Sequence, residues 1–211
     1  MLNIDTYLIS LKHRADRRSE SLNEIQKINL NHDLVHVIDA QLSSRNGVIG
    51  AANTHAYALS HFLHFSDGEY CLIFEDDFSI GDPEKLHENL RPLLQQPVDW
   101  DVLLLASNQA VPTERTRYPN VFKIIYAQTC SGYLVTRKYA PTLIKTFYES
   151  AQHISYNYKR FPVRTSNHFY AFDMMWKPLQ LEANFYAFLP QLVKQRDSFS
   201  EIENKFVSYG V

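Results

Sequence analysis

Three consecutive carboxylates, Glu75, Asp76 and Asp77, follow directly on the apolar run 71–74. Crowded carboxylates repel one another and raise one another's pKa unless positive charge compensates. A divalent cation such as Mn²⁺ or Mg²⁺ supplies that charge, because hard cations take carboxylate oxygens as ligands. The alternative is a solvated acidic turn at the end of a strand. Spacing alone favours the two interpretations equally.

A basic cluster follows an earlier apolar run. Arg14, Arg17 and Arg18 come shortly after Leu11, where the spacing predicts the start of a helix. A helix N-terminus with guanidinium groups suits phosphate, although a solvated charged face is the usual interpretation of an isolated cluster. The sequence has no Gly-rich phosphate loop of the Rossmann or P-loop type. A nucleotide would therefore need a metal to take the charge of its diphosphate.

Asp173 is a single acid among aromatic residues and methionines. Burying an unpaired charge is costly, so this carboxylate is a candidate general base with a raised pKa. An N-cap for a helix over 174–181 is an equally favoured alternative.

Two other polar groups carry weaker signals. His55, His61 and His64 share a predicted helix without an HExxH pattern, so zinc is poorly supported, and His55 is expected to pack near the site or orient a loop. The segment with Gln195 and Ser198 has no nucleophile elbow for a catalytic serine.

The elements that would position these residues alternate in type. Apolar runs typical of strands occupy 6–11, 34–38, 70–74, 102–105, 121–126, 132–135 and 185–193, and helical spacing occupies 16–28, 51–65, 83–93, 139–148 and 173–181. This alternation predicts an α/β fold with a mainly parallel central sheet flanked by helices. Ligands bind at the carboxyl ends of such strands, so we expect the acids and the basic cluster to share one edge.

Composition excludes several classes of protein. The 211 residues are 45% hydrophobic, which argues against disorder, and 21 basic against 23 acidic residues argue against a dedicated nucleic-acid binder. No apolar run is long enough for a transmembrane helix and no secretory signal is apparent, so we expect a cytoplasmic protein. Cys71 and Cys130 are expected to be free thiols.

A series of segments occurs in one order along nearly the whole chain. They are Leu8 to Leu11 with Arg14 and Arg17, Gly47 to Ala51 with Thr54 and His55, Phe74 to Asp77, Asp101 to Leu105, Ser131 to Thr136 with Ala140, Asp173, Pro190, Gln195, and Ser198 to Ile202. Their order resembles glycosyltransferase family 25, which includes lipooligosaccharide and procollagen galactosyltransferases. Ser10, Ala51 and Thr54 replace the Asn, Cys and Ser of the family pattern, so the chain resembles a divergent member.

The resemblance implies a Rossmann-like A-type glycosyltransferase fold in a single domain over 1–211. Residues 1–107 would form the nucleotide-sugar-binding half and residues 108–211 the acceptor side. The three acids would hold Mn²⁺ or Mg²⁺, chiefly through Asp77, and Asp173 would be the catalytic base. The donor-binding residues would be Ser10, Leu11, Arg14, Arg17, Asn53, His55, Ser107, Gln195 and Ser198.

The implied activity is metal-dependent, inverting transfer of galactose or glucose from a UDP-sugar to a glycan or hydroxylysine-type acceptor, as in lipopolysaccharide biosynthesis. The tract 152–164, rich in Tyr and Arg, is either part of an acceptor surface or a packed loop. One alternative is a degenerate nucleotide-sugar-binding module without catalysis. Another is a metal-dependent nuclease or phosphohydrolase, which the near-neutral charge and the lack of further spaced acid motifs disfavour.

Overall fold

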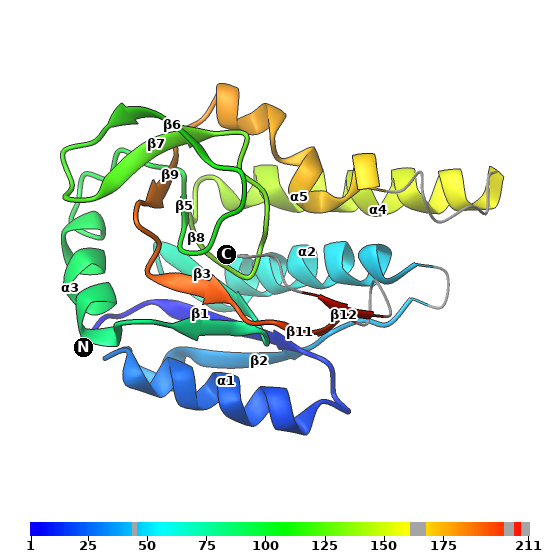
Figure 1. Cartoon of the computed structure of the whole chain (residues 1–211), viewed down its shortest axis with the longest axis horizontal. Coiled ribbons are helices and arrows are strands. Elements are labelled where there is room, and N and C mark those ends of the chain that lie inside the picture. Colours follow the sequence, from blue (N-terminus) through cyan, green and yellow to red (C-terminus); the bar gives the residue numbers. More distant parts are fainter. Residues whose placement is uncertain (44–45, 161–167, 201–204, 208–211) are drawn as a thin grey trace.

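The computed structural model describes residues 1–43, 46–160, 168–200 and 205–207 of the chain (Figure 1). Its strands are β1 (Asp5–Ser10), β2 (Val35–Asp39), β3 (Tyr70–Glu75), β4 (Phe78–Ile80), β5 (Val102–Leu104), β6 (Val111–Arg115), β7 (Val121–Ile125), β8 (Gly132–Thr136), β9 (Phe185–Phe188), β10 (Val193–Gln195), β11 (Ser198–Ser200) and β12 (Lys205–Val207). Its α-helices are α1 (Ala15–Lys27), α2 (Gly47–Phe65), α3 (Pro83–Leu93), α4 (Ala140–Arg160) and α5 (Phe172–Met175). Short 3₁₀ turns are η1 (His32–Leu34), η3 (His168–Tyr170) and η4 (Pro178–Leu181).

Within the described ranges, eight strands form one sheet in the order β2-β1-β3-β8-β5-β9-β7-β6. β8 and β7 run against the other six strands, as their antiparallel pairings with β3, β5 and β9 show. The mixed α/β fold with a mainly parallel sheet is therefore confirmed. Parallel neighbours need a crossover connection, which α1 provides between β1 and β2.

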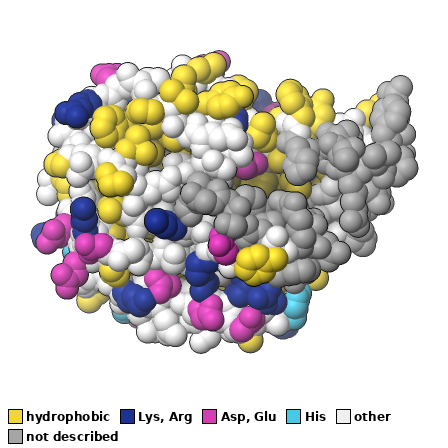
Figure 2. Space-filling model, viewed as in Figure 1, with side chains coloured by type: hydrophobic (Ala, Val, Ile, Leu, Met, Phe, Trp, Pro, Cys, Tyr) yellow, Lys and Arg dark blue, Asp and Glu magenta, His cyan; other side chains and the backbone are white. Residues whose placement is uncertain are grey.

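Helices cover both faces of the sheet. Successive strand residues point to opposite faces, so Tyr7 and Ile9 of β1 pack in the core under α2, α4 and α5, while Leu8 packs in the core on the side of α1 and α3. This burial on both sides explains why the central strands are continuous apolar runs. On the face shown in Figure 2, acidic and basic side chains lie side by side in the region of α1, below the sheet.

The order in which strands are added to the sheet reverses at β1. The chain passes from β1 through α1 to β2 on one side, and then through α2 to β3 on the other side of β1. The parallel register pairs Ile9 with Glu75, so the carboxyl ends of β1 and β3 adjoin. The expectation that the acids and the basic cluster share one edge is confirmed, and this edge lies at a topological switch point.

Several predicted elements differ from the structure. The helix expected over 139–148 continues to Arg160, so 152–160 is helical and 161–164 lies outside the described residues. The helix expected over 173–181 divides into α5 and η4, because Pro178 cannot continue the backbone hydrogen bonding. The extended run expected over 185–193 ends at Phe188, two residues before Pro190. β6 had no apolar pattern to predict it, since all five of its residues are exposed.

Cys71 and Cys130 are both buried free thiols. Within the described ranges, none of the helices has the length and apolar character that crossing a bilayer requires.

Arg137 fixes the C-terminal end of α2 to the sheet. Its guanidinium donates hydrogen bonds to the carbonyl oxygens of Phe62, Leu63, Ser66 and Gly68, at 3.4, 3.3, 2.5 and 2.6 Å. It also lies 4.5 Å from the centre of the Phe62 ring. The last carbonyls of a helix have no partner within the helix, so one side chain satisfies several of them at once.

We therefore expect Arg137→Ala to lower the free energy of unfolding by about 2–4 kcal/mol, because it leaves these carbonyls without a donor. Arg137→Lys should recover less than half of the loss, since an ammonium lacks the planar fork of donors. Urea denaturation measures both variants. Arg115→Ala, on exposed β6, is the control, and an equal loss in that variant would contradict the assignment.

Candidate functional site

The three acids form the end of β3 and the turn that follows it. Glu75 is the last residue of β3, and Asp76 and Asp77 make the turn into β4. Because Ile9 pairs with Glu75, the next residue of β1 lies beside Asp76. Ser10 Oγ donates a hydrogen bond to Asp76 Oδ2 at 2.7 Å. The side chain at the end of β1 is thus in direct contact with the acidic motif.

Arg17 of α1 compensates part of the negative charge. Its guanidinium lies 2.7 Å from Asp76 Oδ1 and 3.2 Å from Asp77 Oδ2, and Nε donates to the Asp76 carbonyl at 3.3 Å. All three side chains are at most 14% exposed. The sequence predicts a metal cation beside these carboxylates. In the structure, an arginine side chain supplies positive charge there. Both Asp76 oxygens have partners, so Asp76 chiefly orders the turn.

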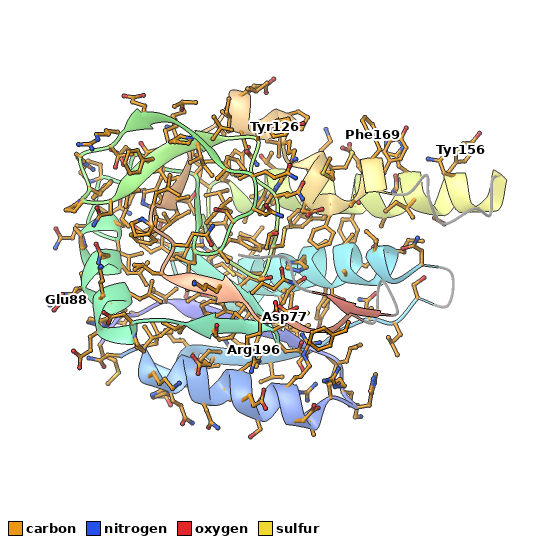
Figure 3. The ribbon with its side chains drawn as sticks, in the orientation of Figure 1. Asp77, Glu88, Tyr126, Tyr156, Phe169 and Arg196 are labelled. Carbon is orange, nitrogen blue, oxygen red and sulfur yellow. The ribbon has the colours of Figure 1, made fainter. Side chains whose placement is uncertain are left out.

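A C-terminal strand closes over the acidic turn. β10 pairs antiparallel with β4 and sets Gln195 opposite Phe78. Gln195 Nε2 then donates to Asp77 Oδ2 at 3.0 Å. The backbone N–H of Arg196 donates to the Asp77 carbonyl at 2.6 Å, and its guanidinium donates to the Asp76 carbonyl at 2.8 Å. Figure 3 shows Arg196 beside Asp77. The sequence analysis missed Arg196, although its position next to Gln195 was the available signal.

Asp77 is the acid whose second carboxylate oxygen could still accept a ligand. Burial raises its pKa to about 6, nearby Glu75 adds to the rise, and Gln195 and Arg17 oppose it. Burial likewise raises the pKa of Asp76, against the opposing charge of Arg17. Within the described part of the chain, Asp77 Oδ1 is buried and has no hydrogen-bond partner. A buried carboxylate oxygen without a partner is costly, and a bound cation would remove that cost.

The donor set fits one kind of metal site. Among the described residues, no group of three or more His, Cys, Asp or Glu side chains is arranged to hold a metal ion. A cage of protein ligands alone therefore does not fit. Mg²⁺, however, is commonly held by one or two carboxylates together with substrate phosphates. Asp77 Oδ1 fits that role, with Glu75 as a neighbouring carboxylate.

Glu75 is held by a buried histidine. Tyr133 O–H and His55 Nδ1 are 3.1 Å apart, and His55 Nε2 and Glu75 Oε1 are also 3.1 Å apart. Burial raises the pKa of Tyr133 well above its usual range, so its hydroxyl is the donor to Nδ1. His55 Nε2–H consequently donates to Glu75, which assigns the tautomer by its partners. His55 thus packs beside the acidic motif, which is one of the two roles expected for it.

Asp173 lies in the first turn of α5, whose N-cap is Ala171. The alternative interpretation of Asp173 as an N-cap is therefore wrong. Thr129 N–H donates to its Oδ2 at 3.3 Å. Burial raises its pKa, Thr129 opposes the rise, and Glu75 lies close enough to add to it. The structure thus brings Asp173 to the same region as the acidic motif.

The other residues of the basic cluster have local partners. Arg14 donates to Asp16 at 3.1 and 3.0 Å. Arg18 donates to Asp39 at 2.6 Å and to the Ser10 carbonyl at 3.2 Å. Leu11 is half-buried directly after β1. The cluster therefore lies at the carboxyl edge of the sheet, where Arg17 forms ion pairs with the acids and Arg14 is close enough to oppose the rise in the pKa of Asp76.

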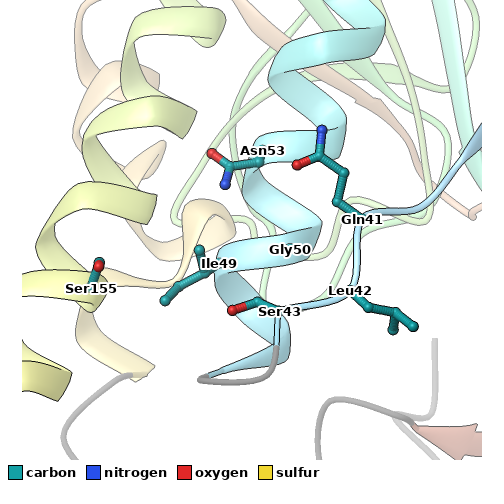
Figure 4. Close-up of a pocket in the computed structure, with 7 residues that line it drawn as sticks. All are labelled: Gln41, Leu42, Ser43, Ile49, Gly50, Asn53 and Ser155. Atoms are coloured by element: carbon teal, nitrogen blue, oxygen red, sulfur yellow. The ribbon is translucent and has the colours of Figure 1, made fainter.

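Asn53 lies apart from the acids. It lines a cleft of about 340 Å³ between α2, the segment after β2 and α4. Figure 4 shows the lining residues, which are Gln41, Leu42, Ser43, Ile49, Gly50, Asn53 and Ser155. Gly50 permits the close approach here, because a Cβ at that position would lie 2.0 Å from the Gln41 carbonyl oxygen. None of the three acids lines this cleft.

Two expected donor-binding residues remain. Ser107 is buried after β5 and is held by Gln191, whose side-chain amide donates to its carbonyl and accepts from its N–H. Ser198 begins β11, and its side chain lies outside the described residues.

Comparison with known proteins supports the fold. No protein-family model matches this sequence, and no curated protein is significantly similar to it. A glycosyltransferase involved in the glycosylation of the major capsid of PBCV-1 is similar in structure over 94% of this chain and 95% of its own, with a TM-score of 0.51 and 8% identity. UDP-glucose pyrophosphorylase complexed with UDP-glucose is similar over 92% of each chain, with a TM-score of 0.50 and 8% identity.

The chain has the A-type glycosyltransferase fold. At this level of identity the likeness extends to the fold alone, and a nucleotidyltransferase shares it. The chemistry of this chain therefore has to be argued from the site.

The burial of Asp77 has a consequence for stability. A folded-state pKa of about 6, raised from 3.8, means that this carboxyl's contribution to stability is present below pH 4 and is lost as pH rises through 6. We expect Asp77→Asn to be more stable than the wild type by about 1–3 kcal/mol at pH 7.5 without divalent cations. The difference should shrink towards pH 4.5.

Urea denaturation at the two pH values measures this difference. Glu88→Gln, an exposed carboxylate on α3 (Figure 3), is the matched control and should show no such gain. A less stable Asp77→Asn protein at pH 7.5 would contradict the burial argument.

Proposed function

We propose that this chain is a divalent-metal-dependent glycosyltransferase that transfers galactose or glucose from a UDP-sugar, with inversion, to a glycan or hydroxylysine-type acceptor. The observation that carries the proposal is the unpartnered, buried Oδ1 of Asp77 at the carboxyl edge between β1 and β3. Ligands of open α/β sheets bind at such an edge. The ordered segments that resemble family 25 support the same function.

The charge at this edge suits a diphosphate together with a cation. Glu75, Asp76 and Asp77 face the guanidinium of Arg17, which forms ion pairs with the two aspartates, and that of Arg196, which donates to the Asp76 carbonyl. A bound Mn²⁺ or Mg²⁺ would stabilise the charge that develops on the leaving UDP. Arg14, at the start of α1, and Gln195, on β10, lie in segments that border the same edge. In this proposal they orient the diphosphate by hydrogen bonding.

Asp173 is the proposed base. Inversion requires one group to accept the proton of the acceptor hydroxyl as that oxygen attacks the anomeric carbon. Burial raises the pKa of Asp173, which favours proton uptake, and Thr129 N–H fixes one of its oxygens. The relay from Tyr133 through His55 orients Glu75 between the metal-binding turn and this base.

Nucleotidyl transfer is the main rival that the shared fold leaves open. Glycine allows a backbone to approach a phosphate closely, but the first glycine of this chain is Gly47. The segment after β1, where the nucleotide would bind, is therefore built without glycine. This composition favours a transferase that holds the diphosphate through side chains and a metal.

Release of UDP from a panel of UDP-sugars, with and without Mn²⁺, tests the activity. We expect UDP-galactose or UDP-glucose to be turned over only with the metal. Asp77→Ala should reduce turnover by about 10²-fold or more, because it removes the carboxylate that holds the cation. Glu88→Ala is the control on an exposed surface. Turnover of UTP with a hexose 1-phosphate in place of these reactions would overturn the proposal in favour of nucleotidyl transfer.

Asp173→Asn separates catalysis from binding. It keeps the shape of the side chain and removes the base, so we expect kcat to fall by about 10²–10⁴-fold. UDP affinity, measured by calorimetry, should change less than about twofold. This pair of results would also exclude a nucleotide-sugar-binding module without catalysis. Unchanged turnover in Asp173→Asn would require a different base.

A further inference from the structure

Two loops from the second half of the chain form a wall near Asp173. One follows β5 and the other precedes β8. Asn108 and Gln128 join them by exchanging backbone hydrogen bonds, both 2.9 Å long. The wall is thus held together by backbone hydrogen bonds. Gln109 follows Asn108 directly, and Tyr126 lies two residues before Gln128.

An aromatic ring and a cation meet on this wall. Tyr126 is 58% exposed, and Lys177 Nζ lies 4.0 Å from the centre of its ring. Lys177 Nζ also donates to Gln109 Oε1 at 3.3 Å. In the part of the chain that the structure describes, no carboxylate forms a salt bridge with Lys177. We call Gln109, Tyr126 and Lys177 the platform.

The backbone behind the platform is held by buried groups. Gln180 is fully buried; its side-chain amide accepts from Ala127 N–H at 2.8 Å and donates to the Ala127 carbonyl at 2.7 Å. Trp176 Nε1 donates to the same carbonyl at 3.0 Å. Tyr126, the preceding residue, is therefore presented from an ordered backbone. Such a site loses little conformational freedom when it binds a ligand.

The backbone of the wall is strained where it meets Asp173. Gln109, Tyr126 and Thr129 have φ values of 58°, 67° and 86°. They are three of the four non-glycine residues with positive φ in the described ranges. A β-branched residue such as Thr129 rarely adopts this region, and such strain gathers at functional sites. Thr129 N–H is the group that binds Asp173 Oδ2, so the same loop carries the platform and positions the base.

Charge links the platform to the base. Burial raises the pKa of Asp173, and Lys177 is close enough to oppose that rise. Lys177 follows Asp173 by four residues and contacts the Tyr126 ring. The hydrogen bond from Thr129 to Asp173 and this ring contact join the base to the platform.

We propose that the platform is the acceptor subsite, and that it binds a sugar ring of a saccharide acceptor beside the unit that reacts at Asp173. This inference rests on the proposed transferase activity. The open part of the Tyr126 ring offers an apolar surface for the C–H face of a pyranose. The remaining N–H donors of Lys177 and the amide of Gln109 bind its hydroxyls. A hydroxylysine acceptor fits less well, because its ammonium would meet the like charge of Lys177.

Ligand-observed saturation-transfer NMR on the full chain tests the subsite, with and without UDP and Mg²⁺. The probes are lactose, N-acetyllactosamine, maltose, cellobiose and a hydroxylysine-containing peptide. We expect at least one disaccharide to bind the wild type. Tyr126→Ala should weaken that binding by about 10-fold, while Tyr126→Phe, which keeps the ring, should stay within about twofold. Lys177→Met should weaken it several-fold.

Tyr57→Ala is the matched control, since Tyr57 is a 47% exposed tyrosine on α2. One-dimensional proton spectra check that each variant is folded. Equal disaccharide binding by Tyr126→Ala and the wild type would overturn the subsite. So would binding of none of the disaccharides, or Tyr126-dependent binding of the peptide alone.

Calorimetry with UDP and Mg²⁺ separates this inference from the proposed function. If UDP binds and the disaccharides do not, the subsite falls and the nucleotide-sugar proposal stands. If Tyr126-dependent disaccharide binding occurs without UDP binding, the saccharide site stands and the UDP-sugar transferase falls. If neither ligand binds, both proposals fall.

Discussion

The guanidinium of Arg17 lies buried between Asp76 and Asp77, and the geometry of the site depends on this contact. Removing one partner from a buried charge pair leaves the other charge uncompensated. Arg17 therefore ties α1 to the turn after β3, and Ser10 ties the end of β1 to the same turn through its own hydrogen bond to Asp76. The guanidiniums of Arg17 and Arg196 both contact this turn, which carries three neighbouring carboxylates. In the proposed function, a divalent cation bound with a diphosphate occupies the carboxylate oxygen that remains.

The C-terminal segment contacts the same acidic turn. Gln195 and Arg196 are more than a hundred residues from the acidic turn in sequence, yet they donate to Asp77 and to its backbone. The short pairing of β10 with β4 brings them there. Three segments from the start, middle and end of the chain thus meet at one carboxylate. The oxygen that they leave without a partner, Asp77 Oδ1, is the one available to a ligand.

The second half of the site is organised differently. Near Asp173 the determinants are backbone shape and buried amides: the positive φ of Thr129 and the clamp of Gln180 on Ala127. The acidic edge is thus built from charge at strand ends, which is visible in sequence, and the region around Asp173 from loop conformation. Local sequence gives no pattern for a tyrosine or threonine with positive φ, and the contact of Lys177 with Tyr126 depends on how two distant segments pack.

By itself the sequence determined the α/β class, the central strands and the position of the acids at a strand end, because these follow from apolar periodicity and local charge. It also indicated Asp173 and Gln195 as candidate site residues, Asp173 through its aromatic surroundings and Gln195 through its place in the ordered segments. Only the tertiary structure decided that Arg17 compensates the acids, that Asp77 Oδ1 is buried without a partner among the described residues, and that Asn53 lines a separate cleft. These facts depend on contacts between residues far apart in sequence, which the sheet register and the strand crossovers create.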